Sequence, residues 1–279
     1  MAITEAFVCP MHPDVRTPTP GSCPRCGMKL ILASAESPTA YVLETAVTPT
    51  PLKAGRPQRL TLRVRHPESD ATIQRFVEVH ERIFHLFVIS QDLRHFEHTH
   101  PTLKADGSLE VEIMLPRQGA YQLYADFLPD GGTPQLLQRS LLTEGFAEDP
   151  ERGRARLVPD LEDKTDGDIS VLLQVSAGEG LIAGRREMFR MRVSDTHTRL
   201  PIKDLEPFLG APAHALIISE DLADAVHSHP VEEFSRPNGP DIVFEAVFPR
   251  PGLYKLWTQF QRHGRVATVS FTLPVSERP

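Results

Sequence analysis

The sequence lacks the features that mark membrane-spanning, nucleic-acid-binding and disulfide-rich proteins. No stretch approaches the run of about 18 apolar residues that spans a bilayer as a helix. Its 30 lysine and arginine residues are outnumbered by 37 aspartate and glutamate residues, and the resulting net charge of −7 disfavours nucleic acid as a partner. Only three cysteines are present, and pairing two would leave one over, which argues against a disulfide framework.

Catalytic and targeting signatures are missing as well. The chain has no Gly-x-Ser-x-Gly nucleophile elbow, no phosphate loop and no dinucleotide fingerprint. Residues 1–8 are too short and too poor in basic residues for a secretory signal. We therefore expect a protein that is not an enzyme and is cytoplasmic as the sequence is written. It would be periplasmic or otherwise extracytoplasmic if an upstream signal is missing.

All three cysteines lie in one short segment near the N-terminus. Two knuckles, Cys9-x2-His12 and Cys23-x2-Cys26, can each place two donors on one ion. Zinc would take the three thiolates and the imidazole, whereas a softer ion such as Cu(I) would favour the thiolates and could recruit a methionine. The predicted ligands are Cys9, His12, Cys23 and Cys26, with Met11 and Met28 as further candidates. The alternative is a structural zinc staple, because about 30 residues cannot fold on apolar burial alone.

This segment resembles a known family. The pattern Cys9-Pro10-Met11-His12-Pro13, a short spacer and Cys23-Pro24-Arg25-Cys26-Gly27-Met28 is similar to the small heavy-metal-binding domain. That domain is fused to copper-transporting ATPases and to periplasmic adaptor subunits of copper and silver efflux pumps. The resemblance covers about residues 6–33 only. It implies a copper or zinc ion as the cofactor and a metal transporter or efflux component as a partner.

The chain after residue 45 repeats itself. A shift of 129 residues aligns residues 52–101 with residues 181–230 without a gap. After a four-residue insertion the match resumes, and residues 116–123 fall on residues 249–256. Because this period is the size of a domain, it indicates two copies of one domain and not a solenoid of short repeats.

Each copy has the sequence pattern of β-strands, and no segment has that of a long amphipathic helix. Several segments alternate apolar and polar side chains, namely residues 60–64, 109–115, 189–193 and 241–248. The 26 prolines and 17 glycines supply turns between short strands. About 100 residues with six or seven strands per copy are typical of an immunoglobulin-like or related β-sandwich.

The predicted architecture is therefore all-β and has three parts. A small metal-binding knuckle module at residues 1–35 precedes two tandem immunoglobulin-like β-sandwiches, at residues 40–147 and 165–279. The boundary between the sandwiches falls in residues 144–165, which are charged and lack the period of a strand.

Histidine is the one polar residue type that the duplication keeps as a set. Both copies contain His-x12-His-x-His-Pro. The matched residues are His85, His98 and His100 in the first copy and His214, His227 and His229 in the second. Three neutral imidazoles suit copper, zinc or nickel and leave a position for water or a fourth ligand. Candidate fourth ligands are Glu97, His95 and Asp224.

A β-hairpin would bring each triplet together. If residues 90–95 form the loop, Phe87 lies opposite His98 and His85 lies opposite His100, so that all three imidazoles share one face. A shift of one residue in register would send His85 to the other face. Two alternatives remain: the histidines hydrogen-bond within the sandwich or cap a loop, or the two copies pool six histidines by pseudo-symmetric packing.

These patterns predict a non-enzymatic protein that binds copper or a similar heavy metal, zinc included, for buffering, delivery or resistance. One alternative is an interaction protein built from tandem sandwiches with a structural zinc knuckle. A histidine-ligated metalloenzyme is the third possibility. His227-x-His229 followed by Glu232 loosely resembles the ligands of cupin metal enzymes, but the other copy has Leu103 at the matching position.

Overall fold

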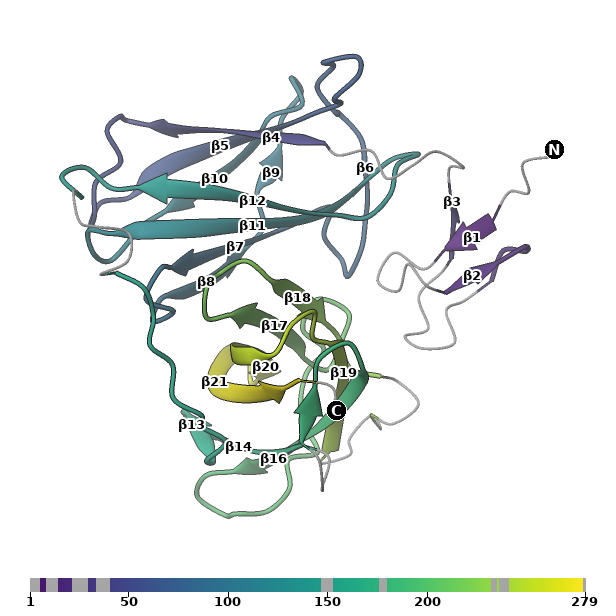
Figure 1. Ribbon diagram of the computed structural model, residues 1–279, viewed down its shortest axis with the longest axis vertical. Coiled ribbons are helices and arrows are strands. Elements are labelled where there is room, and N and C mark those ends of the chain that lie inside the picture. The colour runs from purple at the N-terminus through teal and green to yellow at the C-terminus, as the bar shows by residue number, and fades with distance from the viewer. Residues whose placement is uncertain are drawn as a thin grey trace. The chain divides into compact units, whose positions relative to one another are not determined.

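The computed structural model describes residues 6–8, 15–21, 30–33, 41–146, 153–175, 180–231, 235 and 241–277. All regular elements in these ranges are β-strands. The chain divides after Arg154 into two compact units, each of which holds one β-sandwich (Figure 1). The predicted all-β fold with two tandem sandwiches is confirmed. Within the described ranges, no helix has the length and apolarity needed to cross a bilayer.

Near the N-terminus, three short strands form an antiparallel sheet in the order β2-β1-β3. They are β1 (Ala6–Val8), β2 (Arg16–Thr17) and β3 (Ile31–Ala33). The predicted metal ligands of this segment, Cys9, Met11, His12, Cys23, Cys26 and Met28, lie outside the described residues.

The first sandwich has a four-stranded sheet, β4-β5-β10-β9, and a five-stranded sheet, in which β12-β11-β7-β8 form the path and β6 pairs with β11. Its strands are β4 (Val42–Thr48), β5 (Gln58–Arg65), β6 (Phe76–Val77), β7 (Phe84–Ser90), β8 (Phe96–Thr99), β9 (Thr102–Leu103), β10 (Leu109–Ile113), β11 (Ala120–Pro129) and β12 (Gln135–Leu142).

The second sandwich repeats this arrangement with sheets β13-β14-β16-β19 and β15-β21-β20-β17-β18. Its strands are β13 (Lys164–Asp166), β14 (Ile169–Val175), β15 (Leu181–Ile182), β16 (Arg186–Asp195), β17 (His214–Ser219), β18 (Ala225–Ser228), β19 (Asp241–Val247), β20 (Gly252–Arg262) and β21 (Arg265–Ser276).

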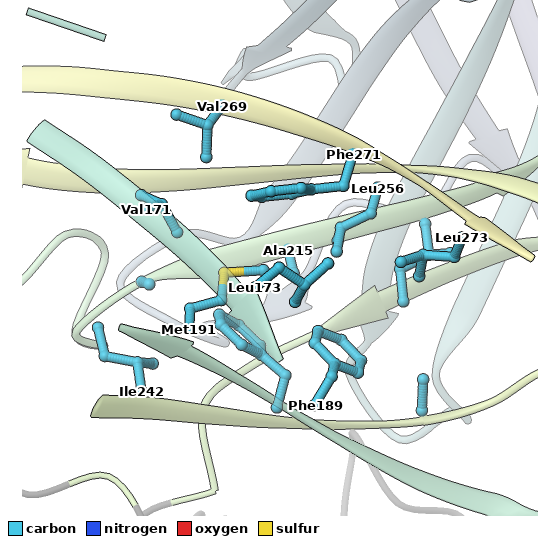
Figure 2. Close-up of a cluster of buried hydrophobic side chains, with 14 of the residues drawn as sticks. Val171, Leu173, Phe189, Met191, Ala215, Ile242, Leu256, Val269, Phe271 and Leu273 are labelled. Carbon is cyan, nitrogen blue, oxygen red and sulfur yellow. The ribbon is translucent and has the colours of Figure 1, made fainter. Parts of the chain in front are cut away.

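Side-chain alternation gives each sandwich its own core. In β5, Leu60, Leu62 and Val64 are fully buried, and the side chains between them are partly exposed. Successive side chains of a strand point to opposite faces, so these three line the interior. In the second sandwich, Met191 of β16 and Phe271 of β21 contribute to the equivalent core (Figure 2).

The structure has more strands than the predicted six or seven per copy. Nine lie in each sandwich in the described part of the chain. The additional ones are short, with two residues in β6, β9 and β15 and three in β13. Such pairs and triplets are too short to show an alternating pattern, so their pairing depends on the neighbouring strand and not on their own residues. Strand β13 also occupies the end of the 144–165 stretch, where no strand was expected.

Candidate metal centres

The predicted hairpin register is present in both sandwiches. Phe87 of β7 pairs with His98 of β8, and Leu216 of β17 pairs with His227 of β18. Because directly opposed residues share a sheet face, this register places the histidines of each triplet on one side of their hairpin.

The loop of each hairpin is held by the same side-chain hydrogen bonds. In the first copy, Ser90 Oγ donates to Asp92 Oδ1 at 2.5 Å and accepts from the backbone N–H of His95 at 2.8 Å. In the second copy, Ser219 Oγ donates to Asp221 at 2.6 Å and accepts from the N–H of Asp224 at 2.9 Å. These short-range bonds stabilise one loop conformation. They therefore fix the register on which the histidine cluster depends.

In the second copy, an arginine just before β20 extends this loop network. Arg250 donates to the carboxylates of Asp221 and Asp224 at 2.9 and 2.7 Å. The hydrogen bonds to Asp224 and Asp221 raise the pKa of the Arg250 guanidinium. Tyr254 also donates its hydroxyl to the Arg250 carbonyl at 2.9 Å. The loop of the second hairpin is thus tied to the segment just before β20 by charge-assisted hydrogen bonds.

In the first triplet, three ring nitrogens converge. His85 Nδ1 lies 3.2 Å from His98 Nε2 and 3.3 Å from His100 Nε2. The side chain of His85 is 3% exposed, and the other two are half-buried. The ring of Phe87 stacks on His98 with centroids 4.2 Å apart, which limits rotation of that imidazole.

The second triplet repeats the cluster. His214, His227 and His229 each offer one nitrogen, and these three atoms lie within 4.8 Å of one another. The ring centroids of His214 and His229 are 4.5 Å apart, and those of His227 and His229 are 4.4 Å apart. His214 and His229 are buried, with exposed fractions of 2% and 8%.

A backbone carbonyl fixes the tautomer of the first histidine in each triplet. His85 Nε2 lies 3.0 Å from the carbonyl oxygen of Val79, and His214 Nε2 lies 2.8 Å from that of Phe208. A carbonyl oxygen only accepts, so Nε2 carries the hydrogen and Nδ1 of the neutral ring keeps its lone pair. Histidines that bind metals characteristically donate their second ring N–H in this way.

The two carbonyls belong to equivalent turns. Val79 and Phe208 each open a four-residue turn, and two backbone hydrogen bonds join the first residue of the turn to the last, Arg82 or Ala211. The central residues have positive φ in both turns, at 50° and 60° for His80 and Glu81, and at 53° and 71° for Leu209 and Gly210. Two positive φ values in succession characterise a type I′ turn. The duplication has therefore kept the turn that orients the histidine together with the histidine itself.

The donors of each triplet could hold a metal ion. Three neutral imidazole nitrogens are the ligands that copper, zinc and nickel accept, and three protein ligands leave one position open. No other His, Cys, Asp or Glu joins either triplet within the described part of the chain.

The three fourth-ligand candidates lie elsewhere. Glu97 is one residue from His98 in β8, so it points to the other face of the sheet. It lies 3.7 Å from Nε2 of His95, whose ring packs edge-on against Tyr121. Asp224 accepts hydrogen bonds from Arg250 and Tyr254. The interactions of these side chains belong to the hairpin loops and not to the triplets.

Sequence reasoning did not find the two orienting carbonyls. Residues 79–82 fall on residues 208–211 in the repeat, so the positions are matched. However, His80-Glu81 is not a turn signature, and a backbone carbonyl has no side chain to reveal its role. The only sequence signal is Gly210, at one of the two positions with positive φ.

Comparisons with solved structures find proteins with little sequence identity to this chain. Red sea bream transglutaminase is 12% identical over 85% of this chain and 31% of its own, with a TM-score of 0.25. The Yersinia pseudotuberculosis adhesin InvE is 10% identical over 83% of this chain and 58% of its own, with a TM-score of 0.26. A two-domain fibronectin type III segment of chicken tenascin is 11% identical over 83% of this chain and 97% of its own, with a TM-score of 0.23.

The chain spans less than two thirds of the length of the transglutaminase and the adhesin. TM-scores this low carry no functional argument. None of the curated proteins matches the chain.

Two families match parts of the sequence. Residues 6–31 match the family described as "Heavy metal binding domain". The family described as "Domain of unknown function (DUF8832)" matches twice, at residues 40–136 and 163–277. These two segments cover more than half of the chain and carry one histidine triplet each. The chain therefore belongs to the DUF8832 family, and a segment that matches the heavy-metal-binding family lies ahead of its two copies.

Proposed function

We propose that this protein binds heavy-metal ions, copper or a similar soft metal foremost, and serves metal buffering, delivery or resistance without catalysing a reaction. The observation that carries the proposal is the duplicated triplet, in which a backbone carbonyl sets the tautomer of His85 and of His214. The match of residues 6–31 to a heavy-metal-binding family supports it independently.

The N-terminal segment and the histidine triplets would bind metal ions through different donor atoms. Near the N-terminus, Cys9, Cys23, Cys26 and His12 would capture a soft ion through thiolates, with Met11 or Met28 as a further ligand. The likeness of this segment to the modules of copper ATPases and efflux adaptors supports copper as the ion and a metal transporter as the recipient. The triplets would hold ions through nitrogen alone. Both kinds of donor must be deprotonated, so capture weakens as the pH falls.

A purely structural role explains the triplets less well. One buried histidine needs only a hydrogen-bond partner, and the Val79 and Phe208 carbonyls already provide one. Packing three imidazoles together carries a cost, because they repel one another whenever more than one is protonated. Apolar residues would fill the same space without this penalty.

Metal stoichiometry tests the proposal. We expect zinc or anaerobic Cu(I) to bind one equivalent at each triplet and at least one at the N-terminal segment. His85→Ala and His214→Ala should each remove one equivalent, and the double variant Cys23→Ser with Cys26→Ser should remove the N-terminal one. The matched controls are His66→Ala and His197→Ala, because the repeat has no histidine at the position that matches either residue in the other copy.

The fluorescence of the single tryptophan can report metal binding at the second triplet alone. Trp257 of β20 pairs with Leu216, which pairs with His227 on its other side, so the three side chains share a sheet face. A paramagnetic ion such as Co²⁺ at the second triplet should quench Trp257 fluorescence. His214→Ala should abolish that quenching, and His85→Ala should leave it intact.

Two outcomes would contradict the proposal at the triplets. One is an unchanged stoichiometry in both histidine variants. The other is tightly held zinc confined to the cysteines, which would instead favour an interaction protein with a structural zinc knuckle.

A further inference from the structure

The spacing of the donor atoms in the first triplet restricts the coordination geometry. With metal–nitrogen bonds of about 2.0 Å, two donors at a right angle lie about 2.8 Å apart, and two donors at the tetrahedral angle lie about 3.3 Å apart. The observed distances from His85 Nδ1 are 3.2 Å to His98 Nε2 and 3.3 Å to His100 Nε2. These distances match the tetrahedral value and exceed the separation of neighbouring ligands in square-planar or octahedral sites.

We propose that each triplet is a tetrahedral site with three protein nitrogens and an exchangeable fourth ligand, suited to a d¹⁰ ion such as Zn²⁺ or Cu⁺. This inference rests on the proposed metal-binding function. In the first copy the donors are Nδ1 of His85 and Nε2 of His98 and His100. In the second copy, one ring nitrogen from each of His214, His227 and His229 lies within 4.8 Å of the other two, and we extend the assignment to this triplet because it is the repeat of the first. An ion that prefers square-planar coordination, such as Ni²⁺, would require different distances between the histidine nitrogens.

The surroundings of the triplets favour keeping this geometry. Nε2 of His85 is hydrogen-bonded to the Val79 carbonyl, and the ring of His98 stacks on that of Phe87. The hairpin register fixes the backbone between them. Because 3.2–3.3 Å is also the length of a hydrogen bond between imidazoles, Nδ1 of His85 can exchange a shared proton for an ion without movement of the strands.

The fourth position belongs to a ligand from outside the triplet. No further His, Cys, Asp or Glu joins either group among the residues that the structure describes. Glu97 is on the opposite face, and Asp224 is held by Arg250. A site with an open position can bind water or a small anion, and can pass its ion to an incoming donor through a shared intermediate. This property suits a protein that delivers metal more than one that uses metal as a staple.

Cobalt provides the test, because four-coordinate Co²⁺ absorbs visible light far more intensely than six-coordinate Co²⁺. The probe is Co²⁺ alone, added to the full chain with Cys9, Cys23 and Cys26 replaced by serine so that thiolates do not contribute. We expect intense visible bands that saturate at one equivalent per triplet and disappear when Zn²⁺ is added. His85→Ala and His214→Ala should each remove about half of the absorbance.

Azide then tests the fourth position. A small anion should shift the visible bands, because it replaces the exchangeable ligand, whereas a site closed by a fourth protein donor should not respond. Cobalt that binds to the triplets with only weak absorption would overturn the tetrahedral assignment and leave the proposed function standing. Failure of both Co²⁺ and Zn²⁺ to bind would overturn the function at these histidines as well. The unsubstituted histidines give the spectrum by themselves, so the geometric result does not depend on the folding of any histidine variant.

Discussion

At the scale of single residues, the two ring nitrogens of a histidine can have separate roles. In His85 and His214, Nε2 is committed to a carbonyl, and Nδ1 of His85 faces the other imidazoles. The sequence shows that a histidine recurs but not which nitrogen is available, since the tautomer depends on the partner of the other nitrogen. A residue type alone therefore predicts a ligand, and its hydrogen-bond partner decides how that ligand binds.

Arg262 provides a second residue-scale example, in a cluster of carboxylates. It donates to Asp168 and Asp195 at 2.8 Å and to Asp204 at 3.1 Å, and its own side chain is 12% exposed. The hydrogen bond from Arg262 lowers the pKa of Asp195 and of Asp204. A carboxylate whose pKa is lower in the folded state stabilises the fold above its unfolded pKa of about 4, and that contribution is lost as the pH falls further.

We therefore expect Arg262→Gln to destabilise the second sandwich most at pH 7 and progressively less below pH 4. Denaturant midpoints followed by Trp257 fluorescence at pH 7 and pH 3 measure this difference. Arg192→Gln is the control, because Arg192 bonds Asp241 on the exposed surface and such pairs contribute little. A penalty that stays constant with pH would contradict the assignment of Arg262 as the partner of ionised carboxylates.

At the scale of elements, the hairpin and the preceding turn assemble each candidate centre. The hairpin register was expected from the sequence, because a loop at residues 90–95 puts His85, His98 and His100 on one face and a shift of one residue would send His85 to the other. The turn could not be expected from the sequence, because His80 and Glu81 adopt a left-handed backbone conformation that neither residue favours. Such a conformation persists where the surrounding strands require it, so it could be found only after the strands were placed.

A substitution at Gly210 tests the role of the turn. Gly210 has a φ of 71°, and a β-branched side chain there would be strained. We expect Gly210→Val to displace the Phe208 carbonyl and to lower zinc affinity at the second triplet about 10- to 100-fold, as loss of a supporting partner does at other metal sites. Competition against a chelating dye measures the affinity.

Gly184→Val is the matched control for this effect. Gly184 has a φ of 72° in the same sandwich, and a Cβ added there would meet no atom within 4 Å. It should therefore cause similar backbone strain without disturbing the turn before β17. Equal losses of zinc affinity in the two variants would show that general destabilisation, and not the carbonyl, explains the result.

At the scale of the whole molecule, duplication has produced two sandwiches with separate cores. The core of the second sandwich is formed by residues of β14 to β21 and includes Phe189, Met191 and Phe271 (Figure 2). That of the first includes Leu60, Leu62 and Phe84. Each candidate metal centre lies on a five-stranded sheet whose other face lines the core, so packing of that core holds the hairpin in place.

Phe271→Ala tests how much this core contributes. Phe271 is fully buried, so we expect a loss of about 3–5 kcal/mol in the free energy of unfolding from lost apolar burial and the cavity left behind. Denaturant unfolding followed by Trp257 fluorescence measures the loss. Leu200→Ala in the same sandwich is the control, since Leu200 is 65% exposed and should change stability by at most about 0.5 kcal/mol.

The sequence by itself determined the all-β class, the duplication and the grouping of His85, His98 and His100 on one face, because alternation and repeat spacing are local properties of the chain. It did not determine the short strands β6, β9, β13 and β15, which form only where a longer neighbour offers free backbone groups. Only the tertiary structure decided which nitrogen of His85 and of His214 meets a backbone carbonyl and that Glu97 and Asp224 lie outside the triplets. The physical reason is that hydrogen-bond partners and donor spacings arise when distant backbone segments meet, and residue types do not encode those distances.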